Sequence, residues 1–263
     1  MNRLLDIMAR LRAPDGCAWD REQTPATLKP QMLEECYEVI EAIDTGLPGD
    51  LTEELGDLLL HIVFQAQIAR EAGQFAFADV ANGIADKLIR RHPHVFGDQK
   101  VTDSAGVVAQ WHQLKKVEKP ERESALDGVP RALPALMRAE ALQKKARHVG
   151  FDWSDVRGSL DKVREEVAEA TAEIESDLAF AHANEGKFTP APETAEELGD
   201  LLFSIVNLTR HLKLDAEELL TGANDKFARR FRAVEALIQA QGKAMTDCTL
   251  EELDAAWNVV KAR

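Results

Sequence analysis

The chain carries three motifs twice in the same order, and this internal repeat constrains its fold more than any other feature. Residues 33–91 and residues 164–230 correspond to each other. The matching motifs are Glu34-Glu35-x-x-Glu38 with Glu165-Glu166-x-x-Glu169, Glu53-Glu54-Leu55-Gly56-Asp57-Leu58-Leu59 with Glu196-Glu197-Leu198-Gly199-Asp200-Leu201-Leu202, and Asp86-Lys87-x-x-Arg90-Arg91 with Asp225-Lys226-x-x-Arg229-Arg230. We therefore expect two copies of one structural unit.

Helical periodicity runs through both copies. Apolar residues recur three and four positions apart, no strand pattern competes, and the ten prolines fall between the helical segments or in a first turn. The sequence predicts an all-α protein with helices near residues 3–12, 27–45, 50–72, 78–91, 104–117, 133–147, 159–180, 194–212, 215–241 and 249–262. We place an N-terminal repeat at 1–97, a connector at 98–131 with one helix anchored by Trp111, and a C-terminal repeat at 132–263.

Composition indicates which partners and which cellular compartment suit the chain. The 263 residues are 45% hydrophobic and carry a net charge of −14, so the chain can bury a core and repels nucleic acids and anionic membranes. Cys17, Cys36 and Cys248 are scattered, which argues against disulfides and structural zinc and for a reducing, cytoplasmic setting. We expect a chain that is neither exported nor embedded in a membrane, because it lacks a leader pattern and a long apolar run.

The paired acidic motifs present carboxylates on one helix face, since residues three or four apart are neighbours. A solvated acidic face is the plain interpretation of EExxE. Asp200, however, lies among apolar residues such as Leu198, Leu202 and Ile205, so we expect its helix, and that of Asp57, to be buried on most faces. Buried carboxylates need a cation, and hard oxygen ligands favour Mg²⁺, with Mn²⁺ as a substitute.

Some repeated positions allow two interpretations. Gly56 and Gly199 lie within helices, where glycine is either merely tolerated or required by close approach of another helix. His61, replaced by Ser204 in the second copy, fits a core histidine better than a partner of a metal ligand.

The cationic motif has two interpretations as well. Its residues form either a solvated helix face or a clamp for phosphate oxygens. Trp257 fits core packing or stacking on a nucleobase.

The chain resembles the MazG nucleoside triphosphate pyrophosphohydrolases of the all-α NTP pyrophosphatase superfamily. The residues that carry the resemblance, besides the acidic pairs, are Gly16-Cys17-Ala18-Trp19-Asp20-x-x-Gln23-Thr24, Arg90-Arg91-His92-Pro93-His94-Val95-Phe96, Val149-Gly150-Phe151-Asp152-Trp153 and Lys226-Phe227-x-Arg229-Arg230-Phe231. The resemblance implies tandem four-helix-bundle repeats, a homodimer, and Mg²⁺-dependent cleavage of a nucleoside triphosphate into monophosphate and pyrophosphate.

The resemblance also implies residue roles. The working site falls in the second repeat, with Glu166, Glu169, Glu197 and Asp200 as catalytic metal ligands. The implied substrate-binding residues are Lys162, Glu165, Lys226, Arg229, Arg230 and Trp257. A second-choice site in the first repeat has Glu35, Glu38, Glu54 and Asp57.

The second copy departs from the first between its acidic motifs. Glu38 and Glu54 are 16 positions apart, whereas Glu169 and Glu197 are 28 apart. We expect a longer loop within the segment 177–193, between the helices predicted at 159–180 and 194–212, and Asn184, Gly186, Pro190 and Pro192 mark it.

Two other function classes compete with the hydrolase. One is a non-catalytic helical protein that binds nucleotides or a regulatory partner. The other is a di-iron oxidase, which ranks last because the chain has no Glu-x-x-His motif.

Overall fold

The computed structural model describes all residues except 99–102, 104–105, 108–109, 111–122, 184–186 and 263. The described residues form helices joined by turns and loops and include no β-strand, which confirms the predicted all-α fold class. They divide into two compact units, Met1–Pro120 and Glu121–Arg263. No described helix is long and apolar enough to cross a membrane.

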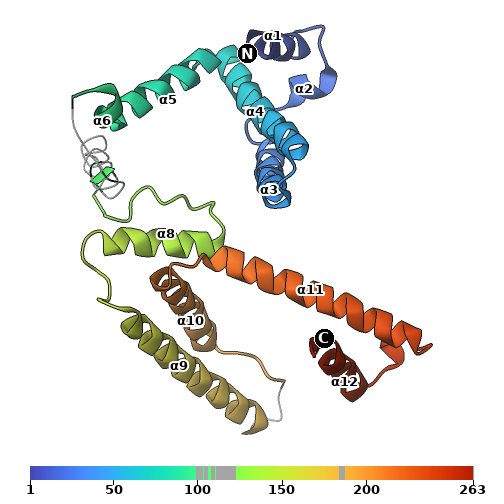
Figure 1. Cartoon of the computed structure of the whole chain (residues 1–263). Coiled ribbons are helices and arrows are strands. Elements are labelled where there is room, and N and C mark those ends of the chain that lie inside the picture. Colours follow the sequence, from blue (N-terminus) through green and yellow to red (C-terminus); the bar gives the residue numbers. More distant parts are fainter. Residues whose placement is uncertain (99–102, 104–105, 108–109, 111–122, 184–186, 263) are drawn as a thin grey trace. The chain divides into compact units, whose positions relative to one another are not determined.

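The first unit begins with short helices and continues with a long helical hairpin (Figure 1). Its elements are α1 (Asn2–Leu11), α2 (Ala18–Glu22), α3 (Lys29–Thr45), α4 (Pro48–Glu71), α5 (Phe77–Arg91) and α6 (Pro93–Phe96). Gly46 ends α3 with φ 70°, and Pro48 starts α4 where a missing N–H costs nothing. The short link between them makes α3 and α4 antiparallel neighbours.

The second unit repeats this plan and adds a final helix (Figure 1). Its elements are α8 (Ala135–Arg147), α9 (Val156–Ala183), α10 (Pro192–His211), α11 (Ala216–Ala240), a 3₁₀ turn (Met245–Asp247) and α12 (Leu250–Lys261). Helices α9 and α10 form the hairpin that corresponds to α3 and α4, and α8 packs on α10 as α1 packs on α4. Asp215 caps α11 by accepting from the amides of Glu217 and Glu218.

Each unit has a small apolar core. In the first, Met8, Leu28, Val63 and Phe64 are buried together where α1 crosses α4. In the second, Val234, Ile238 and Ala256 join α11 to α12.

The predicted helix positions agree with the structure within about three residues, but the expectation that Pro192 lies in a loop is wrong. Helix α9 continues beyond the predicted end at residue 180 to Ala183, and Pro192 is the first residue of α10. Asp177 ties the helices together, because its Oδ2 accepts from the Ala191 amide at 3.0 Å and from the Thr194 hydroxyl. Asn184, Gly186, most of the predicted helix 104–117 and its anchor Trp111 lie outside the described residues.

Two smaller expectations concern cysteines and glycines. All three cysteines are free thiols, as predicted. A Cβ added to Gly56 or Gly199 meets no atom within 4 Å, so close approach of another helix of the same chain does not explain either glycine.

Candidate active site

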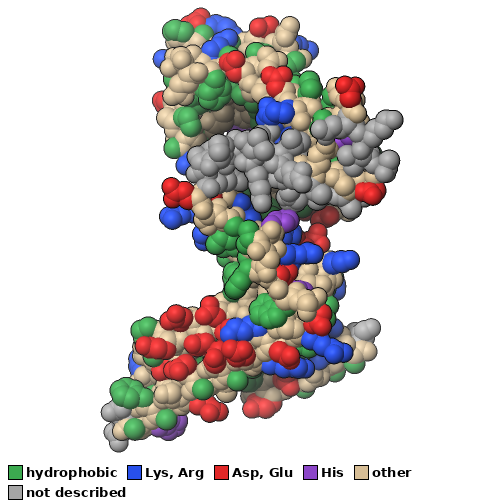
Figure 2. All heavy atoms as spheres, turned by 90° about the vertical axis from the view of Figure 1, so that its left-hand side faces the viewer, with side chains coloured by type: hydrophobic (Ala, Val, Ile, Leu, Met, Phe, Trp, Pro, Cys, Tyr) green, Lys and Arg blue, Asp and Glu red, His purple; other side chains and the backbone are tan. Residues whose placement is uncertain are grey.

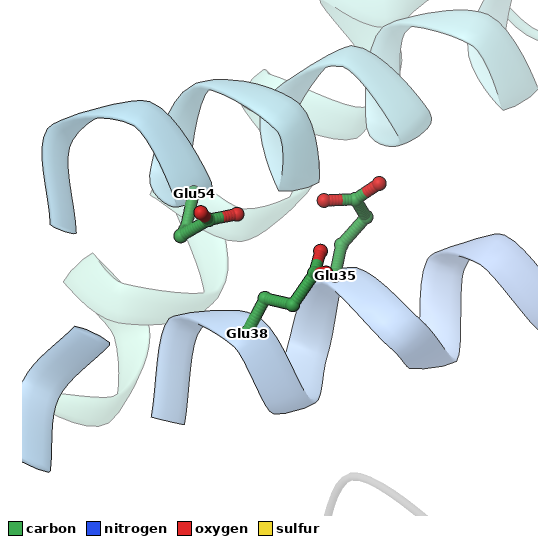
Figure 3. A group of neighbouring side chains, drawn as sticks. All are labelled: Glu35, Glu38 and Glu54. Atoms are coloured by element: carbon green, nitrogen blue, oxygen red, sulfur yellow. The ribbon is translucent and has the colours of Figure 1, made fainter. Parts of the chain in front are cut away.

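The first repeat brings three carboxylates together between its two hairpin helices. Figure 3 shows Glu35 and Glu38 on α3 and Glu54 on α4 pointing toward one another. One oxygen of each lies within 4.8 Å of the other two. The spacing within each helix and the antiparallel packing of α3 on α4 create this cluster.

The second repeat builds the same cluster from Glu166 and Glu169 on α9 and Glu197 on α10. Their carboxylate oxygens also lie within 4.8 Å of one another. Glu166 is only 4% exposed, whereas Glu169 is open to solvent. The cluster therefore has a buried side within the hairpin and an open side that a substrate can reach. Acidic side chains gather over this hairpin at the bottom of Figure 2.

Mutual repulsion perturbs the protonation of both clusters. Partial burial raises the pKa of Glu197, and the charges of Glu169, Glu166 and Asp200 raise it further. The pKa of Glu54 is raised in the same way, first by burial and then by Glu38. Such groups are stabilised by a nearby cation, since it offsets the repulsion between them.

A lysine distinguishes the second cluster from the first. Lys162 Nζ lies 2.8 Å from Glu165 Oε1 and 2.8 Å from Glu166 Oε1. Hydrogen bonds to these two carboxylates raise the pKa of Lys162, so the ammonium stays charged at neutral pH. In the first repeat, Gln31 occupies the position that corresponds to Lys162. Glutamine is uncharged, so this position supplies no cation to the first cluster.

A histidine distinguishes the first cluster. His61 is 7% exposed, and its Nε2 lies 3.7 Å from Glu35 Oε1. Burial lowers the pKa of His61 more than the charge of Asp57 raises it, so the ring is neutral at neutral pH. His61 is thus a buried histidine that also contacts the carboxylate cluster.

Asp57 and Asp200 lie outside the two groups of converging oxygens, although their charges act on Glu35 and Glu197. The expectation of burial on most faces agrees with α4, where every residue from Asp57 to Ala69 is buried or half-buried, but it is wrong for the helix of Asp200 in the single chain. Asp200 is exposed, and its apolar neighbours Leu198 and Leu202 are 43% and 57% exposed. Among the described residues of the second unit, no helix covers Leu198 and Leu202 on α10.

The cationic motif stands apart from the carboxylates. Lys226 and Arg229 are exposed on α11, Arg230 is partly exposed, and none of the three forms an ion pair with another described residue. Trp257 packs between α11 and α12, with its ring centroid 5.4 Å from that of Phe227. This position fits the core-packing interpretation of Trp257.

Sequence reasoning missed a buried polar network at the C-terminal end of α10. Arg210 is 8% exposed and donates to both oxygens of Asp152, and His211 contacts the same carboxylate at 2.9 Å. Burial raises the pKa of Asp152, but hydrogen bonds from Arg210 and His211 outweigh it, and the net pKa lies below the usual value. The sequence signal that could have predicted this network is the pair Arg210 and His211 at the end of the apolar helix α10.

The sequence is similar to a known protein family and to several known proteins. The MazG nucleotide pyrophosphohydrolase domain matches two segments of the chain, residues 23–96 and 157–234. The chain is 48% identical over 264 residues to the nucleoside triphosphate pyrophosphohydrolase of Escherichia coli K12, covering 99% of this chain and 97% of that protein. It is 45% identical to the nucleoside triphosphate pyrophosphohydrolase/pyrophosphatase MazG of Thermotoga maritima, covering 98% and 94%.

A third relative is larger. The uncharacterized protein YabN of Bacillus subtilis is 46% identical over 97% of this chain, which matches 50% of that protein. Both family segments contain a complete carboxylate cluster. The chain therefore belongs to the MazG nucleotide pyrophosphohydrolase family.

Proposed function

We propose that this protein hydrolyses nucleoside triphosphates to monophosphate and pyrophosphate, with Mg²⁺ as cofactor, at the second carboxylate cluster. The observation that carries the proposal is the convergence of Glu166, Glu169 and Glu197 within 4.8 Å in a chain of this family. The relatives in Escherichia coli and Thermotoga maritima have names that state this activity.

The cluster fits a hard divalent cation. Oxygens that share one Mg²⁺ lie at most about 4.2 Å apart, because each lies about 2.1 Å from the ion. Small side-chain rotations bring oxygens within 4.8 Å to this separation. When bound, Mg²⁺ neutralises the triphosphate and polarises the phosphorus–oxygen bond under attack. Mn²⁺ prefers the same oxygen ligands and is the expected substitute.

The chain's own residues bind and orient the substrate. Glu166 and Glu169 on α9 and Glu197 on α10 would hold the cation, with Asp200 one turn further along α10. One carboxylate of this group accepts a proton from the attacking water. Lys162, fixed by Glu165 and Glu166, offers a cation at the edge of the cluster, where it donates to phosphate oxygens.

The cationic motif of α11 completes the substrate site in this proposal. Lys226, Arg229 and Arg230 bind further phosphate oxygens, and Trp257 lies beside the nucleotide. Lys226, Arg229 and Arg230 form no ion pair with a described carboxylate of their own chain, so we infer that they complete the carboxylate site of a second chain.

The surface of the chain supports a homodimer. Large apolar side chains are exposed on both hairpin helices of the second unit, among them Val167 on α9 and Phe203 on α10. Exposed apolar surface of this kind is typical of a face that a partner covers. Leu198 and Leu202 beside Gly199 on α10 supply an apolar surface for this contact.

Nucleotides are the expected partners, and nucleic acids and membranes are not. The net charge of −14 repels phosphate-rich polymers and anionic lipids, whereas one triphosphate needs only a local cation site. The free thiols fit the reducing cytoplasm.

Product analysis tests the proposed reaction. The purified protein is incubated with nucleoside triphosphates and Mg²⁺, and the products are separated by ion-exchange chromatography. We expect monophosphate and pyrophosphate in equal amounts, and no turnover with chelator. Diphosphate and orthophosphate would contradict the cleavage position, and binding without product would favour the non-catalytic alternative.

A further inference from the structure

The second unit contains a cavity of about 580 Å³ beside the carboxylate hairpin. Its size lies within the range of about 300–1,000 Å³ that small-molecule sites occupy. The cavity lies between α8, α10 and the segment 150–153. Its apolar walls are Leu126, Leu142, Ala146, Phe151, Trp153 and Phe203.

Asn207 presents an unpaired donor to this cavity. It is 8% exposed, and its Oδ1 accepts from Arg210 Nε at 3.0 Å and from a second guanidinium nitrogen at 2.6 Å. Because arginine only donates, the oxygen of the amide must face Arg210. The amide nitrogen Nδ2 makes no hydrogen bond with any described residue.

Gln143 contributes an unpaired acceptor. It is 6% exposed and lines the cavity from α8. Its Nε2 donates to the carbonyl oxygen of Phe203 at 2.8 Å, which fixes the orientation of the amide and leaves Oε1 buried without a partner. Phe203 and Asn207 are four residues apart on one face of α10, so the unpaired acceptor and donor lie near each other.

The first repeat shows that this feature is specific to the second. The shared EELGDLL motif sets the register, in which Phe64 on α4 matches Asn207 and Gln67 matches Arg210. Phe64 is 3% exposed and packs with Met8 and Leu28. Where the first repeat has an apolar core, the second has polar side chains and an open cavity.

Two further features relate the cavity to its surroundings. A Cβ on Gly158 would lie 2.2 Å from Trp153 Cδ1, so this glycine gives the indole room against α9. Asp200, Phe203 and Asn207 occupy positions i, i+3 and i+7 of α10, so the carboxylate face of the helix continues into the cavity.

We propose that this cavity binds a nucleobase, held between apolar and aromatic walls, with an edge that accepts from Asn207 and donates to Gln143. Each of the common bases carries a hydrogen-bond donor beside an acceptor on one edge. Aromatic side chains bind such flat rings by stacking. The site is defined by the cavity and does not depend on the cleavage reaction.

Nucleoside binding tests the site without catalysis. Adenosine, guanosine, cytidine and uridine are titrated separately into the full-length protein without Mg²⁺, and binding is measured by calorimetry. We expect saturable binding of at least one nucleoside. Asn207→Asp, which keeps the acceptor for Arg210 and removes the donor, should weaken it at least about tenfold. Asn82→Asp makes the same chemical change at an exposed position of α5 and should leave binding unchanged.

A second variant tests the site independently of Asn207. Gln143→Met keeps the side-chain volume, removes the unpaired acceptor and should also weaken binding. Circular dichroism checks that each variant keeps its helices. The proposal is overturned if no nucleoside binds at concentrations of about 10 mM, or if both folded cavity variants bind as tightly as the wild type.

Competition identifies the source of the base. Inorganic triphosphate with Mg²⁺ occupies the carboxylate cluster without supplying a base. If it leaves the nucleoside bound and a non-hydrolysable nucleoside triphosphate displaces it, the cavity holds the base of the substrate. If neither displaces it, the cavity holds a separate nucleoside. Cleavage of triphosphates by a protein that binds no nucleoside would refute the cavity site and leave the proposed reaction intact.

Discussion

Replacing Leu202 by glutamate should separate the proposed dimer into single chains. Leu202 is 57% exposed on α10, so a partner that covers it removes the remaining apolar surface from water, which stabilises the dimer by about 1–2 kcal/mol per chain. Burying the unpaired carboxylate of Leu202→Glu in the interface destabilises the dimer by several kcal/mol more. Taking a total of only about 3 kcal/mol per chain, the twofold interface loses about 6 kcal/mol, and the dissociation constant rises by roughly four orders of magnitude.

Sedimentation velocity at micromolar concentration measures the effect. We expect wild-type protein to sediment as a dimer and Leu202→Glu as a monomer with the same helical content. Leu250→Glu, at a position 77% exposed on α12, is the matched control and should remain dimeric. A monomeric wild type, or a Leu202→Glu protein that stays dimeric, would refute the reasoning from the exposed face of α10.

The remaining predictions concern the carboxylate clusters. Because we assign catalysis to the second repeat, Glu169→Gln should lower turnover at least about a hundredfold, whereas Glu38→Gln should change it less than about twofold. Equal losses of product formation in the two variants would refute that assignment. Lys162→Met should raise the KM for nucleoside triphosphate about tenfold with a smaller effect on kcat, as measured by steady-state kinetics. Glu54 and Glu197 have a pKa raised above the usual 4.5, so the metal-free protein should lose stability as pH rises from 4.5 through their folded-state pKa values, and Mg²⁺ should reverse this loss in thermal unfolding.

The sequence predicted the parts of the structure that depend on local spacing. The helix pattern and the EExxE and EELGD motifs were sufficient to place Glu166, Glu169 and Glu197 side by side, because residues on one helix face and on an antiparallel neighbour must meet. The repeat itself predicted that Glu35, Glu38 and Glu54 form the same arrangement. These features need no knowledge of long-range packing beyond one hairpin.

The features that the sequence did not predict depend on which face of a helix is covered. An apolar segment around Leu198 and Leu202 was taken as buried, but periodicity does not say whether the cover comes from the same chain or from another. The predicted helix stopped at residue 180 because of the glycine and prolines that follow it, yet α9 extends to Ala183 and Asp177 binds the start of α10. Side-chain hydrogen bonds of this kind leave no periodic signal.

The difference between the two repeats follows from single positions on a shared scaffold. Lys162 replaces Gln31 beside the acidic pair, and Asn207 replaces Phe64 two turns beyond the acidic motif of the following helix. The first change places a cation beside the second cluster, and the second replaces a buried phenylalanine by an amide that lines a mainly apolar cavity. Both changes add hydrogen-bonding groups, and both lie in the same copy. This concentration in one repeat is the physical reason to assign substrate chemistry to the second unit rather than to the first.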